Sequence, residues 1–403
     1  MFNLPKNIYV LAIVISLSFS TMSMMILVSG LLGSSIAPSP SLATLPLAVM
    51  VVGTAVASIP AALIMQRIGR KKGLAAGLVV ALLGTMLSFY AASVGHFWLF
   101  VIGSALLGFN AAFIQQSRFI IFENAQNEKQ QADGLTLGLL ANLFGAIVGP
   151  WLGASGKDLV ESPAGYAGSF LLIAVVLCIA LFILLWQFRD IQTSDSVQSS
   201  NSKPLFKLIS NPLFIIASGS AAIGFGVMSL VMTATPISMH EITGHSLDHT
   251  TLVIQSHIAA MFLPSLLSGA LLKRGYRIRL ILLGLGLYAL VSVIALNGIS
   301  VMHYWWALLL LGIGWNLLFL ISTALLSLSH SEQDKFKAQA ANDFIVFSFQ
   351  AIASFAAGWL LFSVSWNGVA WVAAIFSVVW AIVVLALVPK ARLVMQQTRK
   401  QST

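Results

Sequence analysis

The chain has 403 residues, of which 58% are hydrophobic and only 8% charged. Its 21 basic and 12 acidic side chains are too few to cover a surface in contact with water, since soluble domains contain roughly 25% charged residues. This composition excludes a water-soluble enzyme and indicates a protein that crosses a membrane several times. The single cysteine, Cys178, excludes a disulfide within the chain and a thiolate metal cluster.

Twelve apolar runs are long enough to cross a bilayer as helices, which takes about 20 residues each. They cover residues 8–33, 43–65, 73–93, 96–122, 134–156, 166–188, 211–239, 250–272, 279–298, 303–328, 338–362 and 368–389. The predicted fold is therefore an all-α integral membrane protein with twelve transmembrane helices.

The net charge of +9 is carried by short basic clusters between these runs, which is typical of membrane topology and not of nucleic-acid binding. With the N-terminus inside, all of the 21 basic residues except Lys157 and Arg118 fall on the cytoplasmic side. The positive-inside rule therefore predicts cytoplasmic termini. The polar residues 189–210 predict a cytoplasmic linker between an N-terminal six-helix bundle, residues 1–188, and a C-terminal one, residues 211–403.

The two predicted bundles are copies of each other. An offset of 206 residues brings Gly108-Phe109-Asn110 onto Gly314-Trp315-Asn316, and Phe113 onto Phe319. The same offset aligns Phe19, Met22 and Ser23 with Phe225, Met228 and Ser229. Several matches at one offset indicate an internal duplication, and duplicated six-helix halves are typical of transporters that hold a solute between them.

The loop between the second and third runs carries the sequence ALIMQRIGRK, from Ala62 to Lys71. It resembles the signature of the major facilitator superfamily, usually Gly-x-x-x-Asp-Arg-x-Gly-Arg-Arg/Lys, although Ala62 replaces the glycine and Gln66 the aspartate. The resemblance covers all twelve runs. It implies two pseudo-symmetric bundles, alternating access, and a cytoplasmic latch in which Arg67 or Arg70 pairs with an acid such as Glu123.

Two further resemblances bear on the transported solute. The fifth run contains Gly145, Gly149-Pro150 and Gly153, similar to a motif associated with proton antiporters, although we interpret these glycines as helix-packing residues. The basic residue that many proton-coupled members carry early in the fourth helix is missing. Segments of the C-terminal half, among them the one from Gly312 to Asn316, resemble a bacterial branch of the superfamily associated with riboflavin uptake.

Ionisable residues inside apolar runs are costly, so each is a candidate for coupling to protons. The candidates are His257, Asp343 and Arg118. A neutral histidine bonded between helices is the structural alternative for His257, and snorkelling to the interface is the alternative for Arg118. Charged residues at the cytoplasmic surface favour a gate over solute binding: Arg67, Arg70, Glu123, Arg277 and Glu332.

The predicted solute contacts lie on helices that line the central cavity in this superfamily. Asn110 and Asn316 are equivalent amides that either bind carbonyl or hydroxyl groups of a solute or bond neighbouring helices. Trp315 offers a ring face for stacking. Four methionines provide flexible apolar side chains that adapt to a solute: Met22, Met24, Met228 and Met232. The alternative is that these side chains only fill space between helices or face lipid. The scarcity of basic residues argues against phosphorylated solutes.

No phosphate-binding loop occurs, so transport must use an ion or solute gradient and not a built-in ATPase. The sequence predicts no cofactor, no metal and no enzymatic activity. It predicts a monomeric secondary transporter in a bacterial inner membrane, with protons and the lipid bilayer as partners, taking up an aromatic nutrient such as riboflavin. Proton-linked efflux of drugs or of a metabolite such as a siderophore is the alternative.

Overall fold

The computed structural model describes residues 3–189, 205–264, 276–331 and 334–401. Within these ranges every regular element is a helix and none is a strand. Eleven of the described helices are long and apolar enough to cross a membrane. The predicted eighth run corresponds to α10 (Leu247–Phe262) and continues into residues 265–275, which lie outside the described ranges. The all-α membrane fold is therefore confirmed.

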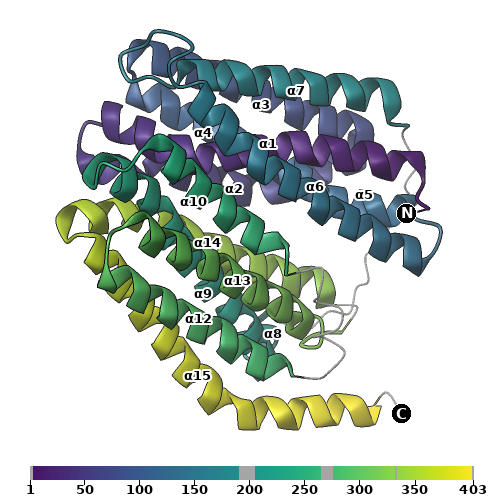
Figure 1. The fold of residues 1–403 in the computed structure, drawn as a ribbon. Helices are drawn as coiled ribbons and strands as arrows, with labels where there is room; N and C mark the ends of the chain where they lie inside the picture. Colours follow the sequence, from purple (N-terminus) through teal and green to yellow (C-terminus); the bar gives the residue numbers. More distant parts are fainter. Residues whose placement is uncertain (1–2, 190–204, 265–275, 332–333, 402–403) are drawn as a thin grey trace.

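Two groups of helices face each other (Figure 1). The first contains α1 (Lys6–Ile36), η1 (Pro40–Leu42), α2 (Leu45–Ile68), α3 (Arg70–Val94), α4 (Phe97–Gln115), α5 (Ser117–Asn124), α6 (Glu128–Ser155) and α7 (Ala167–Gln187). The second contains α9 (Pro212–Pro236), η2 (Ile237–Ile242), α10, α12 (Arg277–Asn297), α13 (Val301–Leu326), α14 (Lys335–Ser363) and α15 (Trp366–Gln401). The short helix α8 (Leu205–Ile209) precedes α9 within the predicted linker.

Three elements differ from the predicted runs. The fourth run is broken at Gln116, so that α4 and α5 are separate helices. The seventh run ends in η2, a π-helix that continues α9. The last run was predicted to end at 389, but α15 continues to Gln401 through Pro389. Hydropathy does not detect this extension, because most of the residues from 390 to 401 are polar or basic, although most of them favour a helix.

The turn between α2 and α3 depends on Gly69. Its φ of 91° lies in the region that residues with a Cβ rarely adopt. This glycine ends α2 by donating its backbone N–H to Met65 O, and α3 begins at the next residue, Arg70. The glycine of the signature loop is thus required by the backbone itself.

Glycines bring α1 and α6 into close contact. A Cβ on Gly145 would lie 2.5 Å from Ser16 O, and one on Gly149 would lie 2.3 Å from Ser20 O. Ser23 Oγ adds a hydrogen bond to Gly145 O at 2.7 Å. Small residues at i, i+4 spacing let helix backbones approach in this way inside a membrane. In this structure these glycines pack helices.

The same α1 to α6 contact gives a stability prediction. Gly149→Ala places a methyl group against a backbone carbonyl that cannot rotate away, so we expect it to destabilise the protein by about 1–3 kcal/mol, as overpacking does elsewhere. Gly286→Ala in α12 is the matched control, because a Cβ there meets nothing within 4 Å. Thermal unfolding in detergent measures both variants. Equal melting temperatures for the two would contradict the prediction.

Candidate solute-binding site

The two halves contact each other at the ends of their helices that lie away from the chain termini, and they diverge toward the termini (Figure 1). Thr44, the residue before α2, links them: its Oγ1 donates to Phe355 O at 3.3 Å and accepts from the Gly358 N–H at 3.2 Å. On another pair of helices, Gln255 of α10 donates to Ile147 O of α6 at 2.7 Å. These bonds form a polar seam between the halves.

Six aromatic rings cluster where the central helices of the two halves face each other. The rings of Trp315 and Phe319, one helical turn apart on α13, are stacked with centroids 5.0 Å apart and an angle of 10°. Phe225 of α9 meets both edge-on, at 5.1 and 5.9 Å. The cluster is completed by Phe347 of α14, Phe262 of α10 and Phe19 of α1.

Several of these rings remain partly accessible. Phe319 is 38% exposed, and Phe19, Phe225, Phe262 and Phe347 are half-buried. Trp315 is buried, and its Nε1 has no hydrogen-bond partner among the described residues. Buried indole N–H groups usually find an acceptor. The cluster therefore combines open aromatic faces with one donor that an incoming acceptor would satisfy.

The two predicted amide residues both lie against neighbouring helices. Asn316 is buried, and its Nδ2 donates to Met261 O of α10 at 2.7 Å. Asn110 is also buried, and its Oδ1 lies 3.3 Å from the position that a Cβ on Gly77 of α3 would occupy. A bond between helices thus accounts for the amide nitrogen of Asn316, whereas the buried Oδ1 of Asn110 accepts no hydrogen bond from the described residues.

The predicted methionines differ in accessibility. Met22 is half-buried on α1, near Phe19 in sequence. Met24 is fully buried, with its Cγ 3.1 Å from where a Cβ on Gly153 of α6 would be. Met228 and Met232 are buried on α9. Of the four, Met22 is the one that leaves part of its side chain open.

The three proton-coupling candidates lie on three helices. His257 is completely buried on α10, and its Nδ1 bonds to Leu308 O at 2.8 Å. Because a carbonyl only accepts, the proton is on Nδ1, and Nε2 is left as a buried acceptor with no partner among the described residues. Asp343 is half-buried on α14 and accepts from Asn342 Nδ2 at 3.1 Å. Arg118 is the second residue of α5, and its side chain is not among those that the structure describes.

The gate candidates include one ion pair. Arg70 Nε donates to Glu123 Oε2 at 3.0 Å, joining the start of α3 to α5. This is the pairing that the signature loop implied, and it lies within the first half. Arg67 is exposed at the end of α2, and Arg277 is half-buried at the start of α12. Glu332 lies outside the described residues.

The sequence predicts a solute contact at Trp315 but at none of the rings around it. Phe225, Phe262, Phe319 and Phe347 were not singled out as solute contacts. A signal for two of them was present in the internal repeat, which aligns Phe19 with Phe225 and Phe113 with Phe319. No comparable signal marks Phe262 or Phe347, because phenylalanine is common throughout the apolar runs.

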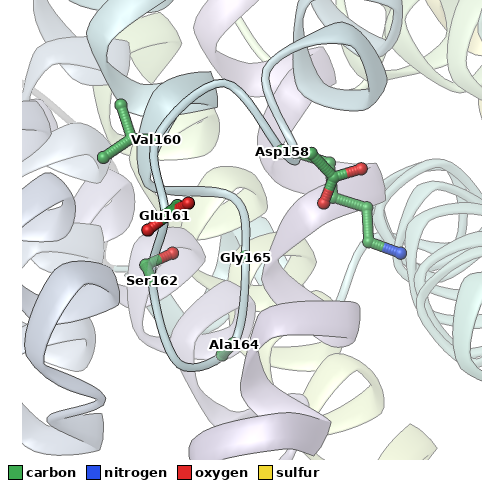
Figure 2. A pocket seen from close by; sticks show the side chains of 7 residues that line it. Asp158, Val160, Glu161, Ser162, Ala164 and Gly165 are labelled. Atoms are coloured by element: carbon green, nitrogen blue, oxygen red, sulfur yellow. The ribbon is translucent and has the colours of Figure 1, made fainter.

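A shallow pocket of about 350 Å³ lies elsewhere, in the loop between α6 and α7. Figure 2 shows Asp158 on one side of this loop and Val160, Glu161 and Ser162 on the other. Beneath it, burial raises the pKa of the Tyr166 hydroxyl, and the nearby carboxylates of Glu241 and Asp158 raise it further. None of the predicted site residues lines this pocket.

The fold and the duplicated halves define a polytopic membrane transporter. The Major Facilitator Superfamily profile matches residues 9–348. The chain belongs to the major facilitator superfamily, and its relatives in this family are transporters and not enzymes.

Two relatives and two solved structures illustrate the similarity. The chain is 35% identical over 385 residues to the riboflavin transporter RfnT of Brucella anthropi, covering 95% of this chain and 94% of that protein. It is 32% identical over 338 residues to the MFS-type transporter YddS of Bacillus subtilis, covering 80% and 77% of the two chains.

The first solved structure is a bacterial homologue of the human lysosomal transporter Spinster, inward-facing and unoccupied. It matches with a TM-score of 0.71 and 12% identity, over 97% of both chains. The second is FucP in the outward conformation, with a TM-score of 0.62 and 17% identity, over 94% of this chain and 97% of that one. At these identities the likeness shows the fold.

The seam gives a second prediction. Thr44→Val removes a hydroxyl that makes two hydrogen bonds across the halves. If these bonds stabilise the contact between the halves by about 1 kcal/mol, their loss raises the equilibrium population of the separated form about fivefold. We expect a cysteine at Ser41, introduced with Cys178→Ser, to react about fivefold faster with a maleimide in this variant. Thr54→Val is the control, because Thr54 lies nearby on α2 and its hydroxyl donates to Gly108 O within its own half. A faster rate in the control as well would refute the assignment.

Proposed function

We propose that this protein transports riboflavin, or a flat heteroaromatic solute of the same kind, across the bacterial inner membrane. The observation that carries the proposal is the cluster around the Trp315 and Phe319 stack. A relative 35% identical over nearly its whole length is a riboflavin transporter, which supports the same solute here.

The chemistry of the cluster suits such a solute. Aromatic rings attract one another in offset-stacked and edge-to-face arrangements, each pair contributing about 0.5–1.5 kcal/mol beyond burial. A flavin ring system is flat and carries carbonyl and imide groups. One of its carbonyl oxygens can accept a hydrogen bond from Trp315 Nε1, which has no partner among the described residues. The buried residues in the described ranges include no lysine or arginine, which favours an uncharged solute over a phosphorylated one.

The arrangement of the halves is that expected of a carrier open on one side. The halves meet at the ends remote from the termini (Figure 1). With both termini in the cytoplasm, as the distribution of basic residues predicts, this is a form open to the cytoplasm. Rocking of the halves about the aromatic cluster then exposes the solute to each side in turn.

Uptake by a riboflavin-auxotrophic strain tests the function. We expect saturable uptake of radiolabelled riboflavin by the wild type, and at least about tenfold lower kcat/KM for Trp315→Leu, because the stacking face and its donor are both lost. Trp306→Leu is the matched control: Trp306 lies on the same helix but is 46% exposed and outside the cluster.

Two outcomes would count against riboflavin uptake. Expressed wild-type protein with no uptake above the empty vector would exclude it and direct attention to efflux of drugs or of a siderophore. Equal losses for the Trp306 and Trp315 variants would show that the effect is structural.

We infer that Asp343 exchanges the coupling proton. Asp343 is half-buried on α14, so that gaining or losing a proton changes the charge at the contacts between this helix and its neighbours. We expect Asp343→Asn to lose riboflavin accumulation driven by a pH gradient while keeping exchange of labelled for unlabelled riboflavin in proteoliposomes. His257→Gln tests a second of the three candidates in the same assay. Gradient-driven accumulation at the wild-type level in the Asp343 variant would contradict the assignment.

A further inference from the structure

We propose that Phe19 and Phe225, equivalent residues of the two halves, bind the two faces of the planar solute. This inference rests on the proposed function and assigns the residues that select a planar ring. It adds to the site a residue of the first half, Phe19, whereas the other rings of the cluster all belong to the second half.

The first observation is the accessibility of these two positions on the central helices. From Ser220 to Met239, along α9 and into η2, every residue is buried except Phe225. From Val14 to Gly33, along α1, every residue is buried except Leu17, Phe19 and Met22. Each central helix is therefore closed by packing over most of its length and open at the phenylalanine that the internal repeat aligns.

The second observation is how these rings are connected. Phe19 meets Phe262 edge-on, with centroids 5.5 Å apart and an angle of 82°. Phe225 meets Trp315 edge-on, with centroids 5.1 Å apart and an angle of 68°. Phe262 and Trp315 are themselves 6.3 Å apart. The four rings thus form a chain from Phe19 through Phe262 and Trp315 to Phe225. One end of the chain belongs to the first half and the other end to the second.

The chemistry follows from the edge-on geometry. An edge-on pair leaves a ring face that it does not use, and rotation about the side-chain torsions turns that face toward a flat guest. A guest held in this way replaces the contact between Phe19 and Phe262, the aromatic contact that joins the halves, with contacts of its own to both halves. The site consequently favours planar, unsaturated rings over aliphatic solutes of similar size.

Riboflavin binding to the purified full-length protein tests the proposal. We expect Phe19→Leu and Phe225→Leu each to raise the Kd for riboflavin about fivefold to tenfold, the loss of one aromatic contact. Phe19→Tyr and Phe225→Tyr, which keep the ring, retain affinity within about twofold of the wild type. Lumichrome, the ring system without the sugar chain, competes with riboflavin, whereas ribitol does not.

Phe170→Leu is the matched control. Phe170 and Phe100 form a similar edge-on pair, with centroids 5.7 Å apart, but both are fully buried within the first half. This variant lowers the melting temperature and leaves the Kd unchanged. If Phe19→Leu behaves in the same way while the wild type binds riboflavin, Phe19 only packs and the inference is wrong. If the wild type binds no riboflavin, the proposed function itself fails, and the inference fails with it.

Discussion

Close approach of helix backbones is the constraint on which both halves depend. In hydrocarbon, apolar side chains gain little by leaving lipid, so helices associate through dense contact and interhelical hydrogen bonds. Gly108 lets its helix approach Met50 O of α2 closely, and Gly312 lets α13 approach His257 O of α10. Neither place has room for a Cβ. The contact of α10 with α13 also carries the bond from Asn316 to Met261 O, so this packing sets the positions of the rings on α13.

The two halves are alike in topology and different in chemistry. The repeat is visible in the fold: Asn7 at the start of α1 bonds to Asn124, and Asn211 before α9 bonds to Ser329 O. Yet the aromatic cluster belongs almost entirely to the second half, and Phe19 is the contribution of the first. Duplication thus supplied two similar frames, and the side chains between them became specialised on one side.

The sequence predicted the architecture well because hydrocarbon imposes length and apolarity on every spanning helix. It failed where those requirements stop: the break at Gln116, the π-helical turn after Pro236, and the continuation of α15 to Gln401. For the site, a buried amide such as Asn316 has the same sequence signature whether it faces a neighbouring helix or a solute. Trp315 is a candidate from the sequence because a large ring beside repeated residues is conspicuous. The orientation of Phe262 or Phe347 depends on helix crossing angles, which one sequence does not reveal.

The break at Gln116 has a mechanical consequence. It separates α5 from α4 and lets this short helix bond to two others: Glu123 to Arg70 of α3, and Asn124 to Asn7 of α1. Asn7 also bonds to the backbone of Arg189, just after α7. These polar bonds brace the terminal end of the first half, where the two groups of described helices lie apart (Figure 1). If the halves rock as proposed, a bundle braced at this end would move as one rigid body, so that a small displacement at the seam would reach the far ends of its helices.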